Sequence, residues 1–290
     1  MSRKAALAVA KRIAQVTDAK PEMLEAIDVC LATLDRSAWP AVAWGFSRLT
    51  NNHCPLEFGF STLEDRLRAT FEVAGPETPN DLRLHDALSL VATLGLPLPG
   101  EAEVAQWRRL QSAAALRWGC WLSLRQTARG FGAKLYIEIP RGPEALTCSP
   151  GSRLHMVGCD MESGAREHYF IWPRVGPLEC AARLQALGLA NVDLLMAELE
   201  AVTGLPIATA LNHARLGISR VDGSGEIALF IDSRAVRGGA TALRPRMMGA
   251  GSYAALLRDR SSLPDHGVLT LIPRARGMEL RASIAGDLLH

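Results

Sequence analysis

The chain has 290 residues, 48% of them hydrophobic and 21% charged, so it can bury a substantial core and has the composition of a globular protein. Its formal net charge of +2 gives no electrostatic reason to expect a nucleic-acid partner or an anionic membrane surface. No apolar run approaches the roughly 18 residues that are needed to span a bilayer, so we expect no membrane partner.

Two features of the sequence predict a cytoplasmic protein. The N-terminal apolar run is soon interrupted by Lys11 and Arg12, which is typical of an amphipathic helix and not of a signal peptide. The six cysteines form no CxxC pair, and most of them lie in apolar runs. We therefore expect reduced, buried thiols in place of disulfides or a zinc site.

The first fifty residues are predicted to be helical. Their spacing predicts helices over Ala5–Val16, Pro21–Leu34 and Ala41–Leu49, and Pro21 is favourable in a first helical turn. The next stretch, Cys54–Pro76, alternates apolar and polar residues on both sides of a polar turn. Such alternation predicts a hairpin of two strands that are each buried on one side.

Four more hairpins are predicted along the chain. Their alternating runs are 120–125 with 134–139, 153–159 with 166–172, 214–221 with 226–233, and 268–272 with 278–284. Helical spacing is found between the hairpins at 81–94, 101–116, 178–187, 193–202 and 252–260. The chain therefore repeats helix pairs and hairpins, which is a structural period and not a set of isolated motifs.

This repeat predicts an α+β fold in which ten antiparallel strands close into a barrel. The apolar strand faces would pack outward against a ring of helices, the polar faces would line a lumen, and closure would leave no exposed sheet edge. We expect a single domain over residues 1–290, with the helices of residues 1–50 packing on the barrel. Two separate α+β domains are the alternative, although no Pro/Gly/Ser-rich linker divides the chain.

The same alternation points basic side chains from different hairpins into the lumen. These are Arg68, Arg125, Lys134, Arg166, Arg215 and Arg281. Burying so many like charges is costly unless they meet an anion or acidic partners. A phosphorylated ligand suits guanidinium forks, whereas the alternative is a structural ion-pair network. The available acids for such a network are Glu57, Glu72, Glu138, Glu226 and Glu279.

Short motifs follow one another in order on the first three hairpins. They are Pro55-Leu56-Glu57, Arg68-Ala69-Thr70-Phe71-Glu72, Lys134-Leu135-Tyr136 and Arg166-Glu167-His168-Tyr169-Phe170. This series resembles that of the ABBA-type aromatic prenyltransferases, nearest to the dimethylallyltryptophan synthase, or indole prenyltransferase, branch. That branch has Pro-x-Glu, Arg-x-Ser/Thr-x-Glu, Lys-x-Tyr and Arg-x-Lys-x-Tyr at these places, so His168 replaces a lysine and Phe170 a tyrosine.

The resemblance implies a PT barrel, in which repeated ααββ units form a ten-stranded antiparallel β-barrel surrounded by helices. It also implies transfer of a dimethylallyl or geranyl group from an allylic prenyl diphosphate to an aromatic acceptor. The acceptor is expected to be an indole or tryptophan, another aromatic molecule, or a peptide side chain. No DDxxD motif is present and the branch works without metal, so we expect neither a metal nor a cofactor.

The lumen pattern and the resemblance together name the candidate site residues. Glu57 is the catalytic candidate, because the family's glutamate accepts a hydrogen bond from the indole N–H. The candidates for binding the diphosphate are Arg68, Lys134, Tyr136, Arg166, His168, Arg215 and Arg281. The candidates for the acceptor and prenyl pocket are Trp121, Phe170 and Phe230.

The later hairpins depart from the family pattern. Ala228-Leu229-Phe230 occupies the place of a further Lys-x-Tyr, and with three tyrosines in the chain the family's tyrosine shield is incomplete. Two alternatives therefore stay open. One is a non-catalytic barrel that binds a small apolar or phosphorylated ligand, and the other is a transferase for a different phosphorylated substrate.

Overall fold

The structure is a computed structural model of the chain. It describes residues 1–40, 42–140, 152–172, 174–213, 216–233, 236–237, 243, 245–247, 249, 251–257, 266–275 and 277–289. The predicted site residue Arg215 lies outside the described residues.

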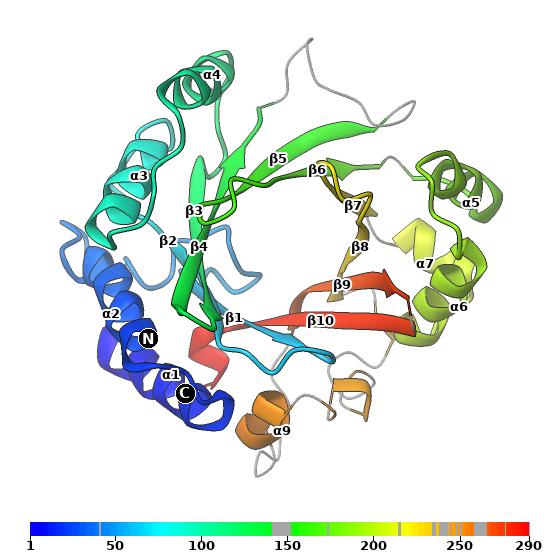
Figure 1. The fold of residues 1–290 in the computed structure, drawn as a ribbon, viewed down its shortest axis with the longest axis horizontal. Coiled ribbons are helices and arrows are strands. Elements are labelled where there is room, and N and C mark those ends of the chain that lie inside the picture. The colour runs from blue at the N-terminus through cyan, green and yellow to red at the C-terminus, as the bar shows by residue number, and fades with distance from the viewer. Residues whose placement is uncertain are drawn as a thin grey trace.

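The strands of the described chain form a closed antiparallel barrel (Figure 1). They are β1 (Leu56–Ser61), β2 (Arg68–Glu72), β3 (Cys120–Thr127), β4 (Gly130–Glu138), β5 (Arg153–Asp160), β6 (Arg166–Ile171), β7 (Gly217–Val221), β8 (Ile227–Asp232), β9 (His266–Arg274) and β10 (Gly277–Ala285). Each strand pairs with the next one along the chain, and β10 pairs back with β1. The ten-stranded barrel of five hairpins is thus confirmed.

Helices surround the barrel on its outer side, as Figure 1 shows. They are α1 (Arg3–Thr17), α2 (Pro21–Asp35), α3 (Arg83–Thr93), α4 (Glu101–Ser112), α5 (Pro177–Ala186), α6 (Val192–Thr203), α7 (Ile207–His213) and α9 (Gly251–Leu257), with the 3-10 helix η2 (Gly286–Leu289). The predicted ring of helices is therefore confirmed. The predictions missed α7 and η2, which are short segments of seven and four residues.

The first two helices carry the start and stop signals that their sequence predicts. The Ser2 side chain accepts a hydrogen bond from the Ala5 N–H at the start of α1, and the helix ends at Asp18, which adopts a left-handed conformation. Pro21 occupies the first turn of α2, where its missing N–H costs nothing. Helix α2 packs against β2, β3 and β4, so it covers the first part of the barrel.

The hydrophobic core lies between the barrel and the helices. Outward-facing strand residues such as Leu56, Phe58, Leu122 and Leu135 have no exposed surface, and they belong to one core cluster with the apolar faces of the helices. Burying each large apolar side chain contributes about 1.5–3 kcal/mol, so this layer supplies the main stabilisation of the barrel. The core therefore leaves the inner strand faces free for polar side chains.

The predicted helix over Ala41–Leu49 is wrong for residues 42–49, which form turns and bends. The Ser47 backbone N–H donates to the His53 carbonyl, and its hydroxyl donates to Glu72 Oε1 at 2.5 Å. These bonds connect the segment to the end of β2 and replace the hydrogen-bond ladder that a helix would need. Among the described residues, no helix is long and apolar enough to cross a membrane.

Candidate functional site

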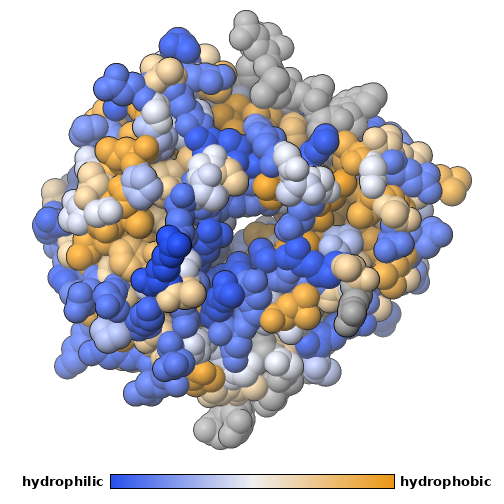
Figure 2. All heavy atoms as spheres, viewed as in Figure 1, coloured by the Kyte–Doolittle hydropathy of each residue, from blue (hydrophilic) through white to orange (hydrophobic). Residues whose placement is uncertain are grey.

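The barrel encloses a cavity of about 620 Å³, and Figure 2 shows a hollow at the centre of the molecule with hydrophilic residues around it. Its lining includes eight of the predicted site residues: Glu57, Arg68, Trp121, Lys134, Tyr136, Arg166, Phe230 and Arg281. Apart from Arg166 at the start of β6, they come from β1, β2, β3, β4, β8 and β10, so the alternation along those six strands predicted the inner face correctly. A cavity of this size suits a small-molecule ligand.

The inner face of β6 differs from the prediction by one residue. Glu167 and Tyr169 line the cavity, whereas His168 and Phe170 do not. Register explains the difference: Arg166 pairs with Cys159, which belongs to the outer core, and residues paired across two strands share a face. A shift of one residue moves every side chain of a strand to the other face.

The prediction that His168 and Phe170 face the lumen is therefore wrong, and the prediction for Arg166 holds in part. Arg166 borders the cavity, but its guanidinium forms a two-pronged ion pair with Glu103 of α4. His168 Nδ1 lies 3.1 Å from a carboxylate oxygen of Asp222. Phe170 is buried in a small cluster of apolar side chains.

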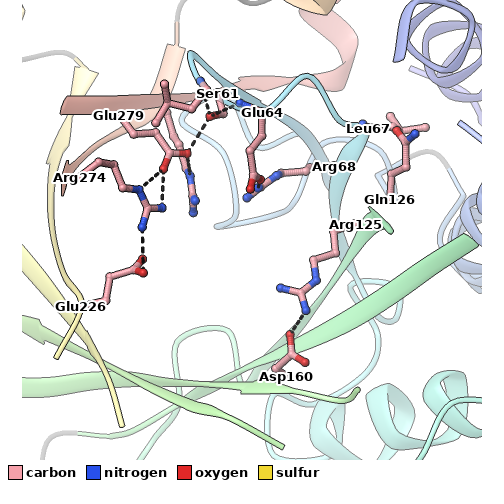
Figure 3. A network of polar contacts seen from close by, with 12 residues as sticks. Ser61, Glu64, Leu67, Arg68, Arg125, Gln126, Asp160, Glu226, Arg274 and Glu279 are labelled. Carbon is pink, nitrogen blue, oxygen red and sulfur yellow. Dashed lines mark hydrogen bonds and ion pairs between the residues drawn. The ribbon is translucent and has the colours of Figure 1, made fainter. Parts of the chain in front are cut away.

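Ion pairs surround the cavity, and Figure 3 shows several of them. Arg68 pairs with Glu64, Arg125 with Asp160 at 2.5 Å, and Lys134 with Glu167. Glu279 accepts from Arg281 at 2.6 Å and from Arg274 at 2.5 Å, and Arg274 also contacts Glu226 at 2.9 Å. The ion-pair network that the sequence left open as an alternative is thus present.

Arg68 retains hydrogen-bonding capacity despite its ion pair. Burial lowers the pKa of its guanidinium, and the nearby positive charge of Arg281 lowers it further. Within the described part of the chain, its buried Nε atom has no hydrogen-bond partner. A buried donor that lacks an acceptor is costly, and so is the repulsion between two cations. An anion placed between Arg68 and Arg281 relieves both costs.

Lys134 is held by an acid and two aromatic rings. It pairs with Glu167, its Nζ lies 3.1 Å from the Tyr169 hydroxyl, and the Tyr136 and Tyr169 ring centroids are each 5.4 Å away. Burial acts to lower the pKa of Lys134, but Tyr136 and Glu167 outweigh it, so the net shift is upward. The ammonium therefore stays charged inside the barrel.

Glu57 is the acid of the cavity that titrates near neutral pH. Burial raises the pKa of Glu57 to about 7, although a hydrogen bond with the Ser283 side chain acts in the opposite direction. No ion pair of Glu57 is present among the described residues, in contrast to Glu279. A carboxyl group with this pKa can accept or hold a proton near pH 7.

Comparison with known proteins identifies the fold. Neither a family model nor a curated protein matches the sequence. Among solved structures, 6-dimethylallyltryptophan synthase from Micromonospora olivasterospora in complex with DMASPP and Trp is similar over 100% of this chain and 99% of its own, with 14% identity and a TM-score of 0.74. The chain has the PT-barrel fold.

Two further structures share this PT barrel. The 5-dimethylallyl tryptophan synthase from Streptomyces coelicolor in complex with DMASPP and Trp has a TM-score of 0.74 and 14% identity over 99% of this chain and 95% of its own. PriB in complex with its product diphosphate has a TM-score of 0.72 and 14% identity over 99% and 97%. The likeness covers the whole barrel, including the hairpins whose motifs depart most from the family.

Aromatic side chains line the PT barrel beside Lys134. The Tyr136 and Tyr169 rings meet edge to face with centroids 5.8 Å apart, and Phe230 lies 5.7 Å from Tyr169. Trp121 lines the cavity as predicted, stacked on Trp118 at 3.8 Å, and its indole N–H donates to Glu72 Oε1 at 3.0 Å. Tyr169, which was not among the predicted site residues, is part of this lining.

The partners of the barrel cations were predicted only in part. Glu279 does pair with the lumen arginine Arg281, but Glu226 pairs with Arg274 at the end of β9 and Glu72 with Arg83 of α3. Glu138 accepts N–H bonds from the backbone of residues 117–119. The acidic partners that were not predicted are Glu64, Asp160 and Glu167. Glu64 lies in a turn, where alternation predicts no face.

Asp160 and Glu167 did carry a signal in the sequence. Asp160 directly follows the predicted strand 153–159, and Glu167 is the second residue of the predicted strand 166–172. The structure pairs Asp160 with Lys134 across β4 and β5. Within the described chain, no three His, Cys, Asp or Glu side chains gather as a metal site.

Proposed function

We propose that the chain is a prenyltransferase that moves a prenyl group from an allylic diphosphate to an aromatic acceptor. The observation that carries the proposal is the pair Arg68 and Arg281, two mutually repelling guanidinium groups at the cavity, with an Arg68 N–H that has no acceptor in the described structure. A diphosphate supplies an acceptor oxygen for that N–H and further negative charge between two guanidinium groups that repel each other. The PT-barrel fold supports the same assignment.

The donor's diphosphate is assigned to Arg68, Arg281 and Lys134. Guanidinium and ammonium groups stabilise the charge that develops on the diphosphate as its bond to the allylic carbon breaks. The bonding electron pair leaves with the diphosphate, and an allylic cation remains. Tyr136 and Tyr169 line the cavity beside Lys134, and we assign their aromatic rings to shielding and stabilising that cation.

The acceptor is assigned to the part of the cavity beside Glu57 and Trp121. An electron-rich ring carbon of the acceptor forms the new bond to the cation, and the ring then loses a proton. Glu57, with a pKa of about 7, is suited to accept a hydrogen bond from an acceptor N–H or to take that proton. Trp121 offers a flat surface on which an aromatic acceptor can stack.

The paired cations favour a second candidate, a barrel that binds a ligand without chemistry. Four of the predicted lumen cations have acidic partners, so the lumen has less excess positive charge than the sequence alone suggests: Arg68, Arg125, Lys134 and Arg281. A transferase for another phosphorylated substrate would use the same cations. The two candidates differ from the prenyltransferase in whether an allylic diphosphate is consumed.

Incubation with a prenyl diphosphate and an acceptor panel distinguishes these candidates. We expect dimethylallyl or geranyl diphosphate to be consumed with tryptophan, simple indoles, phenols or a tryptophan-containing peptide, with pyrophosphate released and no added magnesium. Binding of the diphosphate without pyrophosphate release across the panel would favour the non-catalytic barrel. Glu25, an exposed acid on α2, provides a control variant, Glu25→Gln, that should behave as wild type.

The proposal also covers properties beyond the reaction. We assign the whole of residues 1–290 to one domain and place the protein in the cytoplasm, without a metal or cofactor. The five cysteines that the structure describes are buried free thiols, which fits a reducing compartment. Cys148 lies outside the described residues.

A further inference from the structure

One part of the cavity lining differs from the rest. The side chains that line the cavity from the middle of β7, β8 and β9 are uncharged: Ser219, Ala228, Phe230, Val268 and Thr270. We call Ala228, Phe230 and Val268 the apolar wall. It lies next to the Tyr169 ring, which contacts both Lys134 and Phe230. An extended apolar group that starts at Lys134 therefore meets the apolar wall after passing Tyr169.

The Phe230 ring is accommodated by a glycine on the neighbouring strand. Gly217 is paired with Phe230 in the register of β7 and β8. A Cβ atom at Gly217 would lie 1.7 Å from Phe230 Cε2 and 2.2 Å from Cδ2, so the ring lies directly on the glycine backbone. Gly217 is not among the glycines with positive φ. The lack of a side chain is therefore needed for space and not for backbone conformation.

A second glycine does the same for Lys134. A Cβ at Gly158 of β5 would lie 2.4 Å from Lys134 Cε and 3.1 Å from Tyr169 Cε2. Gly158 and Gly217 thus lie on the two strands that flank Tyr169, and each lets a side chain lie against the barrel wall. Because both side chains lie against the wall, they occupy less of the lumen in front of Tyr169.

We propose that the apolar wall binds the carbon chain of a prenyl donor longer than dimethylallyl, and that Gly217 sets this length by holding Phe230 against the barrel. This inference rests on the proposed function. Ala228 and Phe230 lie on β8, and Val268 of β9 pairs with Asp232, so the wall runs along four residues of the strand, roughly 13 Å. An extended geranyl group covers much of that length, whereas a dimethylallyl group leaves apolar surface uncovered, which is unfavourable.

The test compares wild type, Gly217→Ala, Phe230→Ala and the double variant. Each is assayed with dimethylallyl, geranyl and farnesyl diphosphate at a saturating concentration of one acceptor. We expect wild type to prefer geranyl over dimethylallyl diphosphate in kcat/KM. Gly217→Ala should lower kcat/KM for geranyl diphosphate by about tenfold or more while changing that for dimethylallyl diphosphate little, because a displaced ring removes apolar space.

The double variant separates displacement of the ring from damage to the fold. Without the ring there is nothing for the new methyl group to displace, so Gly217→Ala/Phe230→Ala should recover activity on geranyl diphosphate. Phe230→Ala alone should extend activity to farnesyl diphosphate. Gly59→Ala is the matched control, since its Cβ would meet Arg68 Cβ at an ordinary 3.6 Å, and it should keep the wild-type donor preference.

Binding decides the question if no donor is turned over. The affinities of dimethylallyl and geranyl thiolodiphosphate are measured by calorimetry for the same four proteins, with the same expected order. A chain-length effect on binding without turnover would reject the proposed function and keep the inference. The inference would be overturned if Gly217→Ala lowered activity equally with both donors, or changed only the KM of the acceptor. It would also be overturned if wild type showed no preference between the donors, or if neither analogue bound.

Discussion

The two halves of the barrel wall contribute different chemistry to the cavity. Strands β1 to β4, with β10, supply Glu57, Arg68, Arg125, Lys134 and Arg281, whereas β8 and β9 supply the apolar wall. Both halves have the same backbone arrangement, because each hairpin pairs with the next around one closed sheet. The difference shows that the repeat determines the fold, and that the inner residues of each hairpin determine what the cavity binds.

The largest effect is expected at the acid of the charged half. Glu57→Gln keeps the shape of the side chain but cannot take a proton, so turnover should fall by about 10²–10⁴-fold. The measurement is kcat for prenyl transfer, with Glu25→Gln as the control. In wild type, kcat should rise with pH through a pKa of about 7, the value to which burial raises Glu57. Turnover in Glu57→Gln close to wild type would remove Glu57 from the mechanism.

The anion site of the charged half is tested without any reaction. Pyrophosphate should raise the melting temperature of wild type, because it binds the folded state alone. Arg68→Met or Lys134→Met should weaken pyrophosphate binding about tenfold or more, since each removes a charged hydrogen bond. Arg109→Met is the control, because Arg109 is exposed on α4 and does not line the cavity, and it should bind as wild type. Weaker binding in the control alone would place the anion outside the barrel.

A smaller effect is expected on stability as a function of pH. The pKa of Glu57 in the folded protein is about 7, above the ordinary value of 4.5, so the folded state retains its proton over this range while the unfolded state loses it. The stability that this group contributes is therefore present below pH 4.5 and is lost as the pH rises through 7. Urea unfolding between these pH values should show a stability that falls more steeply in wild type than in Glu57→Gln.

Glu279 does not interfere with that measurement. Burial acts to raise its pKa, but hydrogen bonds from Arg281, Ser61 and Arg274 outweigh this and lower the pKa to about 2. Its contribution to stability is present above the ordinary pKa and is lost only as the pH falls toward 2. Parallel pH profiles for wild type and Glu57→Gln would mean that Glu57 is ionised throughout the range.

The smallest effect is expected on the outer face of β6. His168→Ala should leave pyrophosphate affinity and turnover within about twofold of wild type, because the side chain does not line the cavity. Tyr169→Phe, one residue away on the inner face, should reduce turnover more, since it removes the hydroxyl that bonds Glu167 at 2.7 Å. If His168→Ala instead lowered kcat more than Tyr169→Phe in the same assay, His168 would lie on the inner face of β6, as the motif predicted.

The sequence predicted the barrel because a strand with one buried face has a period of two, and that period is visible in every hairpin. Closure followed from the number of strands and the cost of open edges. The inner face was predicted correctly where one set of alternate residues is clearly apolar, as for Leu56 and Phe58 in β1. The helix predicted near Ser47 does not form, because Ser47 makes hydrogen bonds with His53 and Glu72 that local helix propensity cannot predict.

The face of β6 was not predictable from alternation alone. Arg166, His168 and Phe170 alternate with Glu167, Tyr169 and Ile171, and both sets mix polar with apolar residues. Only the pairing of Arg166 with the buried Cys159 decides between them, and pairing is a tertiary property. The partners of the cations were missed for a related reason, since Glu64 of a turn has no predictable face. The need for glycine at 158 and 217 could not be predicted, because it depends on the Lys134 side chain and the Phe230 ring that lie on these residues in the structure.

The pairing of β10 with β1 has a consequence for the order of folding. The Leu280 N–H donates to Thr62 Oγ1 across 218 residues of sequence, and Ser283, the hydrogen-bond partner of Glu57, lies on the same last strand. Contacts between residues so far apart in the chain are slow to form. While the chain is being synthesised, one edge of β1 therefore stays unpaired until β10 is available. The pKa of Glu57 is raised only when the last hairpin closes the barrel around it.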